Sequence, residues 1–123
     1  MKRAALVLML MAGGCQTPSK PMEVLTPHKL SVAETTAIHD GVRRVLKDPE
    51  SARFGTIVAG ANADGVVTAC GWVNAKNSFG GYTGEKPFLG ILTDGGFVTA
   101  AVGGDSTDVA VTMTMCSRSG LVL

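Results

Sequence analysis

The stretch "CGWVNAKNSFGGYTGEKPF" (residues 70–88) decides how the fold is read, because it joins two alternating apolar runs through a loop rich in glycine and amides. Successive side chains of a β-strand point to opposite faces of a sheet, so the alternation predicts strands at 66–73 and 88–94. Residues 74–87 between them form the long loop of the predicted domain. Loops of this length in compact domains are often functional.

The sequence on either side of this stretch extends the same pattern. Before it, "SVAE" (residues 31–34) reads as a capping box that opens a helix at 32–47, which Asp48 before Pro49 ends. Further alternating runs between glycine turns predict strands at 53–60, 97–103 and 109–116. Turns are expected at "NADG" (62–65), "DGG" (94–96) and "GGDSTD" (103–108). The predicted fold class is α+β, with one N-terminal helix packed on an antiparallel sheet of about four to five strands.

The N-terminal end has the layout of an export signal. Lys2 and Arg3 precede a nine-residue apolar run, and two glycines stand just before Cys15. This end resembles a bacterial lipobox, in which the cysteine is acylated with fatty acids such as palmitate and becomes the new N-terminus. By resemblance to lipoprotein sorting in Gram-negative bacteria, Gln16 favours the outer membrane. The apolar run is too short to span a bilayer, which needs about 20 residues.

The predicted organisation is a lipoprotein signal peptide at 1–14, a lipidated extended tether at 15–30 and a single small α+β domain at 31–123. Three prolines and no apolar period in residues 16–30 favour the tether. Without Lys2 and Arg3, nine basic residues face ten acidic ones. This balance gives no electrostatic basis for a nucleic-acid partner.

The remaining cysteines, Cys70 and Cys116, are expected to form a disulfide in an oxidising compartment. Alternation places Cys70 on one face of its strand with Thr68 and Trp72, and Cys116 on one face of 109–116 with Thr112 and Thr114. The bridge is therefore predicted on the sheet face away from the helix.

Two segments carry a resemblance to a family. "LKDPESARF" (46–54) and residues 70–88 resemble small exported bacterial proteins and lipoproteins with K-D-P-x-S-A-x-F and C-G-x-V-N-x-K-N-x-x-G-G-Y-x-G segments. That family has no assigned activity. The resemblance implies an exported, compact protein and nothing catalytic.

Two stretches that look like ligand-binding loops lack the residue spacing that such loops require. "GGYTGEK" lacks the Ser or Thr that follows the lysine of a phosphate loop, and "GGDSTD" lacks the spacing of a calcium loop. A pair of Cys70 with His39 would need a free thiolate, whereas a disulfide partner is available. We therefore expect no catalytic residue, no metal site and no cofactor.

Two interpretations of the 74–88 loop remain open. It can be an ordered cap on the open end of the sheet, anchored by burial of Phe79, Tyr82 and Phe88. Alternatively, it presents a recognition surface for a protein or a glycan. The candidate binding residues are Asn74, Lys76, Asn77, Tyr82 and Lys86.

These observations predict an outer-membrane lipoprotein, not an enzyme, that acts as a binding or structural module of the cell envelope. Its expected partners are the membrane, through the lipid on Cys15, and an envelope protein or the cell wall. An alternative is a small inhibitor of a cell-wall hydrolase. An enzyme of unrecognised type is a third possibility.

Overall fold

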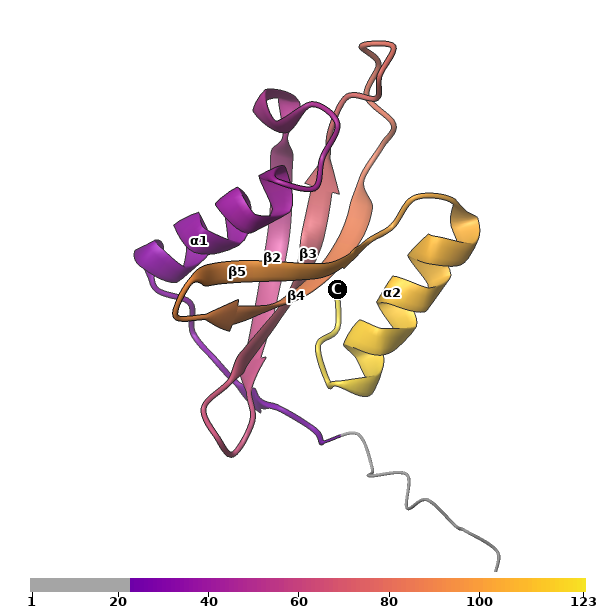
Figure 1. The fold of residues 1–123 in the computed structure, drawn as a ribbon. Helices are drawn as coiled ribbons and strands as arrows, with labels where there is room; N and C mark the ends of the chain where they lie inside the picture. Colours follow the sequence, from indigo (N-terminus) through magenta and orange to yellow (C-terminus); the bar gives the residue numbers. More distant parts are fainter. Residues whose placement is uncertain (1–22) are drawn as a thin grey trace, which may run out of the picture.

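The structure is a computed structural model that describes residues 23–123, and it is an α+β domain with helices on both sides of one sheet (Figure 1). The elements are β1 (Thr26–Pro27), α1 (Val32–Arg43), the short 3₁₀ helix η1 (Pro49–Ser51), β2 (Arg53–Ala61), β3 (Val67–Asn74), β4 (Lys86–Thr93), β5 (Gly96–Val102) and α2 (Ser106–Arg118). The described chain begins at the lower end of Figure 1, and the loop after β3 projects from the upper end.

The sheet is an antiparallel meander in the order β1-β2-β3-β4-β5. Cys70 of β3 pairs with Val58 of β2 and with Leu89 of β4, which places β3 in the middle of the sheet. The four strands expected between residues 53 and 103 are confirmed, with ends that differ by one or two residues. A fifth strand, β1, pairs with Gly60 and Ala61.

Helix α1 starts as its sequence predicts. The Ser31 hydroxyl accepts from the Glu34 amide at 3.2 Å, and the Glu34 carboxylate accepts from the Ser31 amide at 2.7 Å. Its inward face buries Ile38 and Val42. Gly41 marks a close approach, because a Cβ there would lie 2.4 Å from the carbonyl oxygen of Phe97 on β5. The helix ends at Arg43, not at residue 47.

Two apolar clusters lie on opposite faces of the sheet. Val67, Ala69 and Val73 of β3 join the α1 residues Ile38 and Val42 in the larger cluster, which also contains Phe88 and Phe97. On the other face, Cys70 joins Cys116, Leu89 and Leu121. The predicted faces of β3 are confirmed, and half-buried Trp72 shares the Cys70 face by alternation.

The prediction of a strand at 109–116 is wrong, because this segment lies inside helix α2. Alternation of valine and methionine with threonine imitates a strand, but the buried side chains are Thr112 and Cys116, four residues apart. Four-residue spacing is the period of a helix face. The Thr112 hydroxyl donates to the Asp108 carbonyl at 2.8 Å, which satisfies it within the helix.

Both ends of α2 are capped. Of the turn expected at 103–108, residues 103–105 precede the helix and residues 106–108 are its first turn, where the Asp105 carboxylate accepts from the amides of Thr107 and Asp108 at 2.8 and 3.0 Å. At the other end, Gly120 has φ +78° and donates to Ser117, while Leu121 donates to Cys116. This pair of bonds is a Schellman motif, which closes helices through a left-handed glycine.

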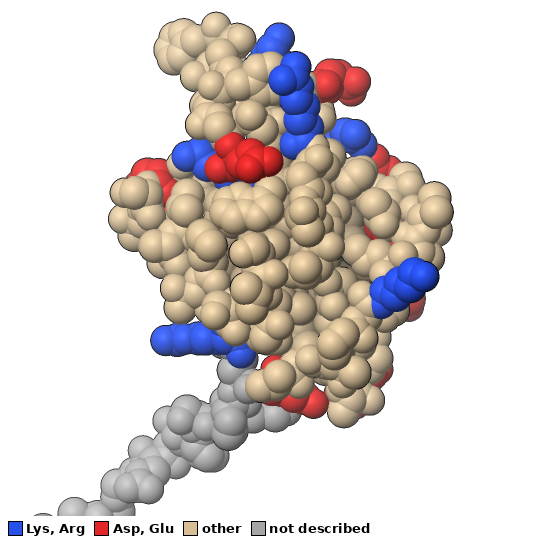
Figure 2. Space-filling view, turned by 180° about the vertical axis from the view of Figure 1, so that it is seen from behind, with Lys and Arg blue, Asp and Glu red and all other residues tan. Residues whose placement is uncertain are grey.

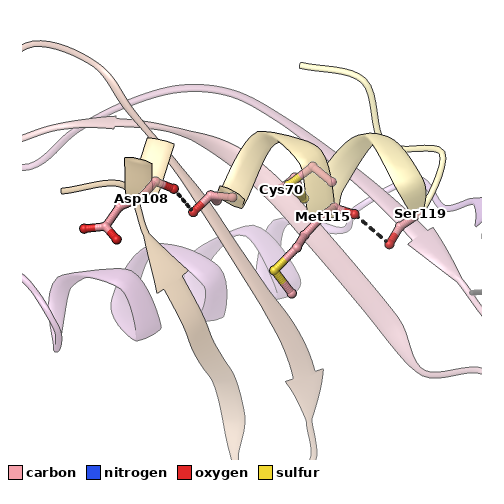
Figure 3. Close-up of a disulfide and its surroundings, with 6 residues drawn as sticks. Cys70, Asp108, Met115 and Ser119 are labelled. Carbon is pink, nitrogen blue, oxygen red and sulfur yellow. Dashed lines mark hydrogen bonds between the residues drawn. A yellow bond between two sulfur atoms is a disulfide. The ribbon is translucent and has the colours of Figure 1, made fainter. Parts of the chain in front are cut away.

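The predicted Cys70–Cys116 disulfide is confirmed, with 6.1 Å between the Cα atoms. It lies on the face away from α1, as expected, and joins β3 to α2 (Figure 3). Both cysteines are buried. The bridge therefore joins a helix to a strand, and not two strands as the alternation suggested.

The expectation of a single, N-terminal helix is also corrected. A second helix covers the other face of the sheet, and β1 precedes α1. In strand β1, Thr26 and Pro27 pair with the end of β2. The strand is also fastened to the segment after α2, because the Leu25 amide donates to the carbonyl of Ser119. Sheet contacts therefore begin before Ser31.

Candidate functional site

The loop between β3 and β4 is a small hairpin closed by backbone hydrogen bonds and by the Asn77 side chain. Its centre is Asn77, whose side-chain oxygen accepts from the amides of Phe79 and Gly81 at 2.9 and 3.1 Å. The Asn77 backbone donates to the Gly81 carbonyl at 2.8 Å, and Gly80 takes the positive φ of +84° that the turn requires. Lys76 and Tyr82 form the bridge below the turn.

The base of the hairpin is fastened to η1. The Lys76 amide donates to the Ser51 hydroxyl at 2.8 Å, and the Tyr82 hydroxyl donates to the Ser51 carbonyl at 3.1 Å. Ser51 in turn donates to the Asp48 carbonyl at 2.8 Å. The segment 46–54 and the segment 70–88, which stand apart in the sequence, therefore meet at this base.

Two cations lie close to the ring of Tyr82. The Arg53 guanidinium is 4.2 Å from the centre of the Tyr82 ring, and the Lys76 ammonium is 5.6 Å from it. Both distances are within the range of cation–π attraction. The tyrosine is 37% exposed, so it supports the hairpin and still presents one side to solvent.

The expected burial of Phe79 is wrong. Phe79 is 96% exposed at the tip of the hairpin, whereas Phe88 is completely buried as predicted. The Asn77-centred turn closes the hairpin with its own polar groups, so the ring of Phe79 is not needed to hold it. An exposed aromatic ring on a bonded hairpin is typical of a contact residue, since aromatic side chains carry much of the energy of interfaces.

The structure brings three of the five candidate residues together. Lys76, Asn77 and Lys86 line a groove of about 490 Å³ beside the hairpin, whereas Asn74 and Tyr82 do not. Asn74 lies opposite Arg53 in the sheet, and its side-chain oxygen is buried without a hydrogen-bond partner among residues 23–123.

The groove contains residues that the sequence did not single out. Lys47 reaches it from the connection after α1, and Gly103 and Gly104 reach it from the end of β5. Apolar side chains complete the lining, namely Val45, Leu46, Val73, Ala75 and Val102. No local pattern could identify Lys47, because it lines the same groove as Lys86 only through the fold.

Charge is unevenly distributed over the surface. In Figure 2, Lys and Arg side chains gather with some acidic ones at the upper end of the view, and the middle of that face has no charged side chains. A second groove, of about 710 Å³, lies at the start of α1 and is lined by three carboxylates, those of Glu34, Asp64 and Asp94. The two grooves beside α1 therefore differ in the sign of the charge that lines them.

Groups for acid–base or metal chemistry are dispersed in the described part of the chain. Cys70 and Cys116 are joined, so neither sulfur is a nucleophile. His39 stacks on Phe54 with 3.9 Å between ring centres, and burial, helped by the charge of Arg43, lowers its pKa. Within residues 23–123, no group of three His, Cys, Asp or Glu side chains is arranged to hold a metal ion.

A second histidine supports α1. His28 Nε2 lies 3.0 Å from a carboxylate oxygen of Glu34. The pKa of Glu34 is lowered, first by the Ser31 amide and then by His28. This pair stabilises the start of the helix and lies away from the hairpin.

Cys15, the predicted lipidation site, and the signal peptide at 1–14 lie outside the described residues. Neither helix of the described chain is long and apolar enough to cross a membrane. Comparisons with protein-family models, curated proteins and solved structures gave no match. The resemblance to small exported proteins therefore stays a prediction, and the hairpin with its adjacent groove is the best-defined candidate site.

Proposed function

We propose that this chain is a non-catalytic binding module of the bacterial envelope, anchored at the outer membrane by a lipid on Cys15. The hairpin between β3 and β4 is its recognition surface, and an envelope protein or the cell wall is its partner. The observation that carries the proposal is the 96% exposed ring of Phe79 on a hairpin that is bonded internally and fastened to η1.

The rigidity of the hairpin supports binding over a role as a cap. A cap buries its anchors, whereas Phe79 contributes no buried surface to the sheet. The backbone beneath the ring is fixed by the Asn77 hydrogen bonds before any partner arrives, so little backbone entropy is lost on binding. Lys76 and Lys86 at the base of the hairpin add charge that can orient a partner.

The position of the hairpin gives further support. It projects from the end of the domain opposite the point at which the described chain begins (Figure 1). A domain tethered through Cys15 would therefore extend this surface away from its anchor.

The test compares two phenylalanines. Phe79→Ala should leave the melting temperature nearly unchanged, because exposed substitutions usually cost under about 0.5 kcal/mol, and should abolish retention on isolated sacculi or in crosslinked envelope complexes. Phe88→Ala is the control for instability, because loss of a buried ring costs about 3–5 kcal/mol. If Phe79→Ala, alone and combined with Lys76→Ala and Asn77→Ala, folds and keeps every partner, the hairpin is not the recognition surface.

The same hairpin favours one alternative, an inhibitor of a cell-wall hydrolase. A narrow, bonded hairpin with an aromatic tip is a suitable shape for entering an enzyme cleft. Purified protein would then slow muramidase or amidase digestion of sacculi, and Phe79→Ala would remove the effect. Retention on sacculi without any change in digestion rate favours the binding module.

A further inference from the structure

We propose that the groove beside the hairpin binds a phosphate monoester that carries an apolar group. This inference rests on the proposed binding function and concerns the groove at the base of the hairpin, which does not include Phe79. The groove is lined by Lys47, Lys76 and Lys86, which come from three different parts of the chain, and its volume is about 490 Å³.

The charge of the groove is not neutralised from within. No acidic side chain lines it, and none of the three lysines has an ion-pair partner in the described part of the chain. One carboxylate lies close to the lining, because a Cβ built on Gly104 would stand 2.7 Å from Asp108 Oδ2, while the Glu85 carboxylate lies beside Gly55 on β2. Three lysines against this one neighbouring carboxylate leave the groove positive.

Of the uncharged polar side chains in the lining, Asn77 is left as a donor, whereas the Thr83 hydroxyl is used within the chain. The Asn77 side-chain oxygen is occupied by two backbone amides, which leaves its NH₂ group available to a ligand. The Thr83 hydroxyl is already directed to the Ala75 carbonyl at 3.5 Å. Donors and cations together select an anion over a cation.

Charge matching favours phosphate over a carboxylate. A single carboxylate would leave two of the three lysines uncompensated, whereas a phosphate monoester carries a charge of about −1.5 to −2 at pH 7. Lysine acts on phosphate as a point charge and does not need the two-pronged geometry of arginine with a carboxylate. The apolar lining, including Leu46, Val73 and Val102, requires a ligand with an apolar part.

Phenyl phosphate combines both features and is the probe. The full mature chain carrying Cys15→Ser is titrated at low salt while the amide NMR signals of Ala75, Gly103 and Gly104 are followed. Phenyl phosphate should shift these signals and bind more tightly than inorganic phosphate, which lacks the apolar part, or phenylacetate, which has one charge. Benzylammonium should leave them unchanged.

Lysine variants connect the binding to the groove. Lys47→Gln and Lys86→Gln should each weaken phenyl phosphate roughly fivefold, the equivalent of about 1 kcal/mol for a screened charge pair. Arginine at either position should restore most of the affinity, and Lys29→Gln, outside the groove, should change nothing. Any of three results would overturn the inference. They are no NMR shift at these amides, binding of benzylammonium as tight as that of phenyl phosphate, or an unchanged affinity for phenyl phosphate in both groove variants.

Two further measurements distinguish a lipid phosphate from a free one, and distinguish failure of the groove proposal from failure of the hairpin proposal. Binding to phosphatidylcholine vesicles that contain phosphatidic acid indicates a lipid phosphate, and binding of phenyl phosphate without such vesicles indicates a free phosphorylated molecule; both support the groove. Phe79→Ala should leave phenyl phosphate binding intact. Loss of probe binding with retained Phe79-dependent partners therefore refutes the groove alone, and the reverse result refutes only the recognition role of the hairpin.

Discussion

Reduction of the Cys70–Cys116 disulfide should loosen α2 before it unfolds the sheet. The bridge closes a loop with a sequence separation of 46. On the chain-entropy model, this constraint stabilises the fold by about 4 kcal/mol, against a total of about 5–15 kcal/mol for a typical domain. Helix α2 depends on the bridge more than α1 does, because only Thr112 and Cys116 of its 13 residues are buried.

The assay is urea unfolding, followed by Trp72 fluorescence, of protein carrying Cys15→Ser with the bridge oxidised or reduced. With an m-value of about 1.5 kcal/mol per molar urea, the midpoint should fall by roughly 2–3 M. Hydrogen exchange on the reduced protein should show α2 amides opening more often than those of α1 around Ile38 and Val42. Cys70→Ala with Cys116→Ala is the matched control, which separates the lost constraint from the lost sulfur volume.

The reasoning would be refuted by a midpoint shift equivalent to less than about 0.5 kcal/mol, together with equal protection of both helices in the reduced protein. Such a result would mean that Leu89 and Leu121 hold α2 without the bridge. A uniform loss of protection in both helices would instead show that the disulfide stabilises the domain as one cooperative unit.

Three further perturbations test the packing. Gly41→Ala should lower the melting temperature by an amount equivalent to about 1–3 kcal/mol, because the new Cβ would meet the Phe97 carbonyl; a rise would contradict the close approach. Asp105→Ala should cost about 1 kcal/mol in urea unfolding by removing the cap of α2, whereas Asp105→Asn should keep most of it. His39 has a lowered pKa, so the unfolded chain binds more protons; its contribution to stability is present above about pH 6.5 and is lost as the pH falls below that value. His39→Gln should make the free energy of unfolding depend less on pH between about pH 5 and 7. If the urea midpoint changes with pH as steeply in the variant as in the original protein, His39 is not the source of the dependence.

Much of the fold was predictable because its determinants are local. The capping box at Ser31, the alternation of β3 and the pairing of Cys70 with Cys116 all follow from neighbouring residues or from the number of cysteines. Helix α2 was missed because alternating β-branched residues outweighed the terminal signals. Those signals were present, since Asp105 precedes Asp108 by three residues and Gly120 follows the basic Arg118, as expected for the two ends of a helix.

The candidate site was predictable only in part, for a different reason. Lys76, Asn77 and Lys86 lie in one recognisable loop, but Lys47 joins them only through the packing of the α1–η1 connection against that loop. Exposure of Phe79 was likewise not available from composition. An aromatic residue between polar ones fits an anchor and a tip equally well, and the hydrogen bonds of Asn77 decide between them.

The geometry of the domain limits what the hairpin can reach under the proposed anchoring. Residues 16–22 between Cys15 and the described chain can span at most about 25 Å. The eight residues of β3 extend about 27 Å on their own, and the hairpin stands beyond their end. A domain standing on its tether would therefore place Phe79 well outside the lipid headgroups of its own membrane. The exposed ring is then poorly placed as a second lipid anchor and well placed for a partner across the periplasmic space, which is why sacculi and crosslinked envelope proteins, not vesicles, are the decisive test for Phe79.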